Sequence, residues 1–159
     1  MGFNYNTRTW QVQTDYTSIG GAFDDQMGFV QRSGVNNIDG KYGRIMRPKF
    51  LSKWVRQTNP HLELDVFTRQ NDGHVDSRYN GWPLGANFQD GSNAENGVNT
   101  SMEDIAAPFA LHNSRGVTVQ PGQAELAEYC AIWNTTNSSS LSFAHRWGGG
   151  RVPSRYQYA

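Results

Sequence analysis

The sequence HLELDVFTRQN, residues 61–71, contains the clearest strand pattern of the chain. Successive side chains of a strand point to opposite faces, so alternation separates two sets of residues here. One face carries the aliphatic side chains Leu62, Leu64 and Val66, and the other carries His61, Glu63, Asp65 and Arg69. The turn sequence Asn71-Asp72-Gly73 follows, and residues 75–88 return as a second extended segment. This stretch predicts an antiparallel hairpin with one apolar and one charged face.

The rest of the chain repeats this strand–turn–strand pattern with hardly any helical periodicity. We expect further strands at residues 3–14, 42–57, 98–111, 124–135 and 140–147, with a break at Pro48. The sequences VNNIDGK (35–41) and QDGSNAENG (89–97) are rich in turn formers and are predicted to be turns. The predicted fold class is therefore all-β, with antiparallel up-and-down strands joined by long connecting loops.

Composition excludes several classes of partner and fold. Lysine plus arginine equals aspartate plus glutamate at 14 each, and no basic cluster occurs, so we expect no nucleic-acid partner. The single cysteine, Cys130, excludes an internal disulfide and a multi-cysteine zinc site. No apolar run approaches the ~20 residues of a membrane helix. Low mean hydropathy (-0.69) combined with 13% aromatic residues favours strands that are polar on one side and aromatic or aliphatic on the other.

Such two-sided strands are compatible with two architectures. A soluble sandwich turns its apolar faces inward, whereas a membrane barrel turns them toward lipid and lines its lumen with the polar faces. Long strands, few aliphatic residues and aromatic residues near strand ends, such as Trp54, Trp133 and Trp147, favour the barrel. The residues alone leave both architectures open.

The stretch DYTSIGGAFDDQMGFVQRSG, residues 15–34, is predicted to be a structured connecting loop, because it is too apolar for a solvated linker and too irregular for one strand. It resembles the signature of a C-terminal outer-membrane β-barrel domain of unknown function, found in bacterial proteins with an N-terminal family-nine-type carbohydrate-binding domain. The matching positions are Asp15, Tyr16, Phe23, Asp24, Gly28, Phe29, Val30 and Arg32. The segments MEDIAAPFAL (102–111) and VQPGQAEL (119–126) resemble later strands of that domain.

The resemblance covers residues 5–150 and implies that residues 1–159 are one incomplete segment of a partial outer-membrane β-barrel. It also implies location in a bacterial outer membrane and contact with outer-membrane lipid. The function expected on this basis is the binding or passage of a solute such as a saccharide. The alternatives are a soluble β-sandwich carbohydrate-binding module and a glycoside hydrolase-associated protein.

Two groups of residues are candidates for structural or ligand-binding roles. In the predicted loop, Arg32 is expected to pair with Asp24 or Asp25 and hold the loop together, and its guanidinium is also a good contact for a sugar or carboxylate. Three aromatic residues interspersed with amides, namely Tyr79, Trp82 and Phe88, have the chemistry of a saccharide platform. The alternative for the second group is a packed turn at Trp82-Pro83.

Catalytic and metal-binding interpretations are weaker. The alternating His61, Glu63 and Asp65 are competent metal ligands, but no second ligand cluster is spaced to help, so a polar row that faces a lumen or solvent is the preferred interpretation. Two acidic pairs, Asp24-Asp25 and Glu103-Asp104, are possible carboxylates of a glycosidase, yet turn or cap roles are commoner for such pairs. We therefore expect no catalytic residue, no metal and no cofactor in this segment.

Overall fold

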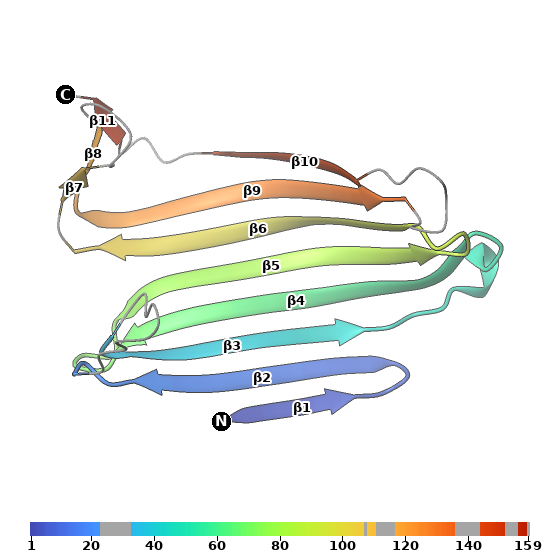
Figure 1. Ribbon diagram of the computed structural model, residues 1–159, viewed down its shortest axis with the longest axis horizontal. Coiled ribbons are helices and arrows are strands. Elements are labelled where there is room, and N and C mark those ends of the chain that lie inside the picture. Colours follow the sequence, from blue (N-terminus) through green and yellow to red (C-terminus); the bar gives the residue numbers. More distant parts are fainter. Residues whose placement is uncertain (23–32, 107, 111–116, 136–143, 152–155, 159) are drawn as a thin grey trace.

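A computed structural model of the protein describes residues 1–22, 33–106, 108–110, 117–135, 144–151 and 156–158. Of these, 73% lie in strands. Eight strands form one antiparallel sheet in the order β1-β2-β3-β4-β5-β6-β9-β10 (Figure 1). Their bounds are β1 Gly2–Asn6, β2 Trp10–Ile19, β3 Val35–Arg44, β4 Val55–Arg69, β5 Val75–Phe88, β6 Asn93–Ile105, β9 Gly122–Asn134 and β10 Ala144–Arg151.

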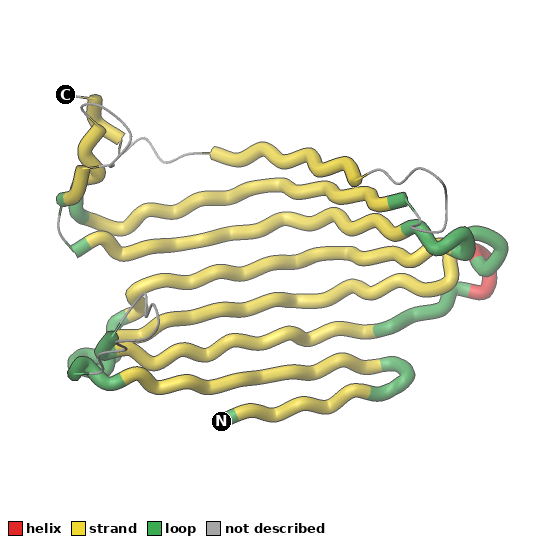
Figure 2. Tube along the Cα trace, in the orientation of Figure 1, coloured by secondary structure: helices red, strands yellow, loops and turns green. Residues whose placement is uncertain are grey.

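The remaining elements lie outside the large sheet. A small three-stranded sheet contains β7 (Phe109–Ala110), β8 (Val117–Val119) and β11 (Tyr156–Tyr158). The single short 3-10 helix of the described residues, η1 (Lys49–Leu51), lies in the connection between β3 and β4 at one end of the sheet (Figure 2). No helix in the described part of the chain is long and apolar enough to cross a membrane.

The expectation of an all-β fold with antiparallel up-and-down strands is confirmed. Each strand of the large sheet pairs with its neighbours in the sheet, and hydrogen bonds do not close the sheet on itself. The hairpin of β4 and β5 has the predicted turn: Gly73 has φ of 70°, and its amide donates to the carbonyl of Arg69 at 2.9 Å. The Asp72 carboxylate accepts the amide of His74 at 2.9 Å, as short polar side chains do in turns.

The large sheet is a single layer. Among the described residues, the buried hydrophobic side chains are Val35 and Met102, and none of the large side chains is fully buried. A two-layer sandwich would instead bury alternate side chains of both sheets in a common core. The described residues contain no such core.

Several predicted boundaries are wrong. Asp15 and Tyr16 lie in β2, so the predicted loop 15–34 is a strand up to Ile19. Residues 35–41 are not a turn but the first part of β3, which is paired along its length with β2 and β4. The predicted loop 89–97 is shorter, because β6 begins at Asn93, and the extended region after Pro48 begins with η1. Cross-strand pairing supplies hydrogen bonds that outweigh the local turn preference of Asn, Asp and Gly.

Six of the loop residues that carry the family resemblance lie outside the described residues, as does the expected Arg32 ion pair. These positions are Phe23, Asp24, Asp25, Gly28, Phe29, Val30 and Arg32, of which Asp25 belongs only to the ion pair.

Candidate functional site

The pairing register assigns the side chains of the large sheet to two faces. We call one the polar face. Its charged members are Asp15, Asp39, Lys41, Glu63, Asp65, Glu95, Glu103, Glu128 and Arg146, and its amides include Gln11, Gln13, Asn37, Asn59 and Asn99. A smaller number of apolar side chains, including Phe67, Leu126 and Ile132, also lie on this face. Polar residues from six strands are thus gathered on one side of the sheet.

The opposite face, which we call the apolar face, carries most of the large hydrophobic side chains. They are Phe3, Tyr5, Trp10, Val12, Tyr16, Ile38, Tyr42, Leu62, Leu64, Val66, Trp82, Leu84, Val98, Tyr129, Trp133 and Trp147. The large hydrophobic residues of the described strands that remain 42–60% exposed all belong to this set. An exposed apolar surface that extends over several strands marks an interaction surface.

Tryptophans gather toward one end of the apolar face. Trp133 on β9 pairs with His145, and Trp147 lies two residues further along β10. The rings of His145 and Trp147 are stacked with centroids 5.4 Å apart. On β2, the ring of Trp10 lies 5.4 Å from the guanidinium of Arg44. This end of the face therefore combines amphipathic rings with a cation.

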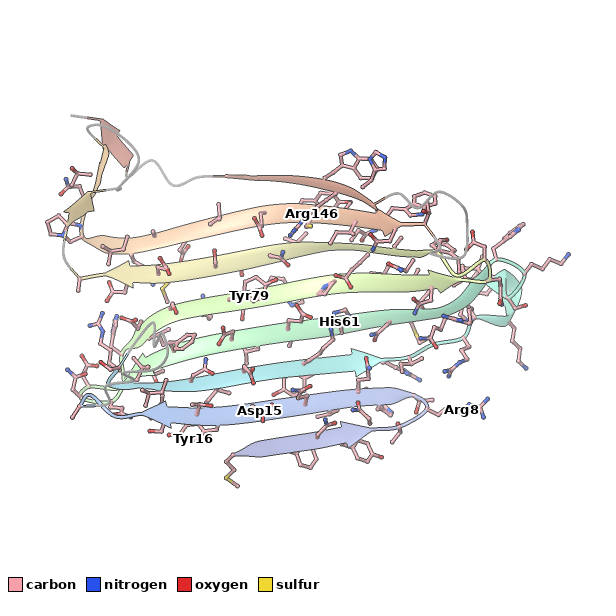
Figure 3. The ribbon with its side chains drawn as sticks, in the orientation of Figure 1. Arg8, Asp15, Tyr16, His61, Tyr79 and Arg146 are labelled. Carbon is pink, nitrogen blue, oxygen red and sulfur yellow. The ribbon has the colours of Figure 1, made fainter. Side chains whose placement is uncertain are left out.

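A groove of about 390 Å³ lies at the centre of the polar face. Its polar side chains come from four adjacent strands and are Gln13, Asp39, Lys41, Glu63, Asp65 and Tyr79. In Figure 3, Asp15, His61 and Tyr79 are labelled on β2, β4 and β5, whereas Arg8 lies at the β1–β2 turn away from them. The sheet thus brings together residues that are far apart in the sequence.

Hydrogen bonds and close contacts connect the polar residues in and beside the groove. Lys41 Nζ donates to Glu63 Oε1 at 2.9 Å, and His61 Nε2 lies 3.3 Å from the same oxygen. The His61 side chain is only 2% exposed, and its Nδ1 is 2.9 Å from the carbonyl oxygen of Asn59. Asn59 in turn donates to Gln11 Oε1 at 2.9 Å. The polar residues of β2, β3 and β4 therefore hold one another in place.

Three aspartates form a row next to these contacts. Asp15 is the direct cross-strand partner of Asp39, and Asp39 is the direct partner of Asp65. The hydrogen bonds found for the outer two come from neutral amides: Gln13 donates to Asp15 at 3.0 Å, and Asn37 donates to Asp65. Tyr79 is the next residue of the row, opposite Asp65. Like charges at directly opposite positions of a sheet repel one another.

A separate ionic cluster lies where the strands end, beyond the side chains of the apolar face. Arg69 donates to Asp76 at 3.1 Å and to Asp104, and His74 Nε2 is 3.1 Å from Asp104. The hydrogen bonds to Asp76 and then Asp104 raise the pKa of the Arg69 guanidinium. At the other end, hydrogen bonds from the hydroxyl and amide of Ser92 lower the pKa of the Asp90 carboxyl. Both groups stabilise turns and strand ends.

The structure does not assemble the predicted saccharide platform. Tyr79 lies on the polar face, whereas Trp82 lies on the apolar face. Phe88 stacks with Trp133 at 6.3 Å between ring centroids, about 20 Å along β5 from Trp82. Of these three aromatic residues, Tyr79 is the one that reaches the groove.

The other candidates that lie in the described residues show no reactive arrangement, and the pair Asp24-Asp25 lies outside them. In the part of the chain that the structure describes, no three histidine, cysteine or acidic side chains are placed to hold one metal ion. Cys130 is a half-buried residue of β9 on the polar face. Glu103 and Asp104 are neighbours on β6, so their side chains point to opposite faces.

Comparison of the chain with protein-family models, curated proteins and solved structures finds no significant match.

Sequence reasoning missed the row of aspartates. A signal was present, because polar residues recur at every second position in Gln11, Gln13 and Asp15 and again in Asn37, Asp39 and Lys41. The second of these segments is also rich in turn formers, and the turn prediction conceals its alternation.

Proposed function

We propose that the chain is a segment of an outer-membrane β-barrel protein of bacteria. In this proposal the apolar face contacts lipid, and the polar face lines an aqueous lumen that binds or passes a solute such as a saccharide. The observation that carries the proposal is the separation of the faces on a single-layer sheet. Most of the exposed aromatic and aliphatic side chains lie on one face, and most of the charged side chains and amides lie on the other. The apolar face also carries the charged residues Arg44, Arg78 and Glu125.

The dimensions of the apolar face support contact with a bilayer. On β4 the face extends from Thr58, in the cross-strand row of Trp133, to Val66, in the row of Tyr16 and Ile38. This span corresponds to the ~9–11 residues that a transmembrane strand needs. Tryptophans at one end and a tyrosine at the other match the aromatic girdles found at the two membrane–water interfaces.

Four polar side chains within the apolar face are hydrogen-bonded in two pairs, which suits a nonpolar environment. The hydroxyls of Thr14 and Tyr42 are 2.8 Å apart, and Asn80 donates to the Thr100 hydroxyl at 3.3 Å. A polar group in hydrocarbon costs several kcal/mol unless it is hydrogen-bonded. These pairs therefore reduce the cost of facing lipid.

The polar face has the chemistry that a hydrated solute requires. Gln11, Gln13 and Asn99 supply amide donors and acceptors, and Tyr79 adds a ring and a hydroxyl beside the groove. Saccharides present hydroxyl groups and apolar ring faces, which amides and aromatic rings recognise. A neutral sugar is therefore a suitable solute to test.

Tryptophan fluorescence tests the membrane part of the proposal. Each of two variants retains one tryptophan, either Trp82 in the middle of the apolar face or Trp54 in the β3–β4 connection, with the others changed to phenylalanine. In vesicles with brominated acyl chains, Trp82 is expected to be quenched by bromine and protected from aqueous acrylamide. Trp54, which is 68% exposed, is expected to show the reverse. Quenching of Trp82 by acrylamide alone would refute lipid contact and favour the soluble β-sandwich.

Osmotic swelling tests the lumen. Vesicles that contain the protein are diluted into an isotonic solution of a neutral monosaccharide, and entry of the sugar is followed by light scattering. Swelling faster than that of protein-free vesicles is expected. A protein that is inserted according to Trp82 quenching but causes no swelling would contradict the passage of solute.

A further inference from the structure

We propose that the polar face selects cations, so that the lumen conducts small cations such as K⁺ in preference to anions such as Cl⁻. This inference rests on the proposed function, because it requires the polar face to line a water-filled passage. Acidic side chains clearly outnumber basic ones on that face: Asp15, Asp39, Glu63, Asp65, Glu95, Glu103 and Glu128 are acidic, and Lys41 and Arg146 are basic. Rings of aspartate and glutamate produce cation selectivity in channels.

The row of aspartates is the strongest part of this charge. Asp15, Asp39 and Asp65 occupy directly opposite positions on β2, β3 and β4, where Cβ atoms are about 5 Å apart. Three negative charges at such spacing repel one another, and the amides of Gln13 and Asn37 do not neutralise them. A mobile cation above the row relieves this repulsion, so the local concentration of cations rises there.

The basic side chains of the polar face do not cancel the row. Lys41 is engaged by Glu63 at 2.9 Å. Arg146 lies on β10, four strands away from β4, which corresponds to about 19 Å at the usual strand spacing. The Debye length is about 10 Å in 0.1 M salt, so water and ions screen the effect of Arg146 on the row. The negative potential over β2–β4 therefore remains.

The buried side chain of His61 is a second observation at the same groove. Its Nδ1 faces the Asn59 carbonyl, which can only accept a hydrogen bond, so Nδ1 is the donor there. Its Nε2 is buried without a hydrogen-bond partner in the described part of the chain and is directed toward Glu63 Oε1, 3.3 Å away. A nitrogen and a carboxylate oxygen at this separation are ligand atoms that a cation in the groove satisfies.

Planar-bilayer recording with the purified protein tests the inference. With a tenfold gradient of KCl across the membrane, the reversal potential gives the permeability ratio of K⁺ to Cl⁻. A potential of about one kT in the lumen changes the ratio of cation to anion concentrations roughly sevenfold. We expect a ratio of about that size in 0.1 M salt, and a decline toward 1 in 1 M salt, where the Debye length is about 3 Å.

Variants at the three aspartates identify the source of the selectivity. The triple variant D15N/D39N/D65N is expected to lose at least half of the preference for K⁺, and Asp39→Asn alone to lose an intermediate part. The triple variant D15E/D39E/D65E keeps the charge and is expected to keep the preference. Glu125→Gln removes one acid from the opposite face and serves as a control that is expected to change nothing.

The outcomes separate this inference from the proposed function. A protein that conducts ions without preferring K⁺, or whose preference is unchanged in both Asp39→Asn and the triple asparagine variant, overturns the cation selectivity and leaves the barrel proposal intact. A protein that conducts no ions and does not insert into vesicles overturns both.

Discussion

Val98 and Asn99 are consecutive residues of β6 that lie on opposite faces of the sheet. Arginine variants at these two positions therefore test which face contacts lipid. Val98 lies on the apolar face between Trp82 and Tyr129, its cross-strand partners, and is 49% exposed. Asn99 lies on the polar face and donates to Glu128 Oε1 at 3.3 Å. The variants Val98→Arg and Asn99→Arg place the same charged side chain at adjacent positions of one strand.

The expected difference is large if the apolar face contacts lipid. Arginine on the lipid face of a barrel costs about 2–4 kcal/mol near the middle of the bilayer. Val98 lies in the cross-strand row of Leu62 and Trp82, inside the span from Thr58 to Val66, so this range applies. It corresponds to a decrease of roughly 30- to 700-fold in the folding equilibrium constant. Asn99→Arg is expected to change stability by less than about 0.5 kcal/mol, because its guanidinium stays in water beside Glu128.

Urea titration of the protein in phosphatidylcholine vesicles measures this difference, with the heat-modifiable shift in gel migration as the signal of the folded state. The wild-type protein and Asn99→Arg are expected to have similar midpoints, and Val98→Arg a much lower one. In a soluble domain, a side chain that is half exposed to water would accept arginine freely. Equal midpoints for the two variants would therefore refute the assignment of the apolar face to lipid.

Three further predictions concern single residues. Asp39→Asn is expected to stabilise the protein by about 0.2–1 kcal/mol in urea titration at low salt, because it removes the carboxylate between two like charges, and the gain should shrink in 1 M salt. Gly73→Ala is expected to lower the free energy of unfolding by about 1–2 kcal/mol, because φ is 70° there, and Gly73→Asn to lower it less. The lowered pKa of Asp90 means that its bonds to Ser92 stabilise the folded state above the unfolded pKa of about 3.9, and that this contribution is lost as pH falls through the folded value. The difference in urea midpoint between wild type and Asp90→Ala should therefore be constant near pH 6 and decrease below pH 4, whereas a constant difference down to pH 2 would contradict it.

The elements that sequence reasoning predicted are those in which alternation and turn chemistry agree. The hairpin of β4 and β5 is the best example, since aliphatic residues alternate along β4 and a glycine with positive φ follows at the turn. In β3 the two signals disagree, because Asn, Asp and Gly favour a turn while polar residues alternate at period two. Backbone hydrogen bonds to β2 and β4 decide in favour of the strand. Such pairing is not local, so the segment's own residues do not contain it.

The candidate site depends on the register between strands, which the sequence of a single strand does not contain. Alternation assigns Asp15, Asp39 and Asp65 to a face of their own strands, but only the register between strands makes them neighbours. The same limit explains the failed saccharide platform. Tyr79 and Trp82 are close in sequence, yet their odd spacing along one strand separates them by the thickness of the sheet.

The chemistry of the two faces gives independent support for this register. A shift of one residue in β2 or β9 would exchange the faces of that strand and place its aromatic side chains among the polar residues of its neighbours. Leu62, Leu64 and Val66 specify the face of β4 strongly, whereas β3 has polar residues on both faces and specifies its own face weakly. The register of β3 is therefore fixed by one side-chain contact on each face of the sheet. Lys41 contacts Glu63 on the polar face, and Tyr42 contacts Thr14 on the apolar face. Asp39 is in the same strand, two residues from Lys41 and three from Tyr42, so the interactions that set the register of β3 also set the row of aspartates.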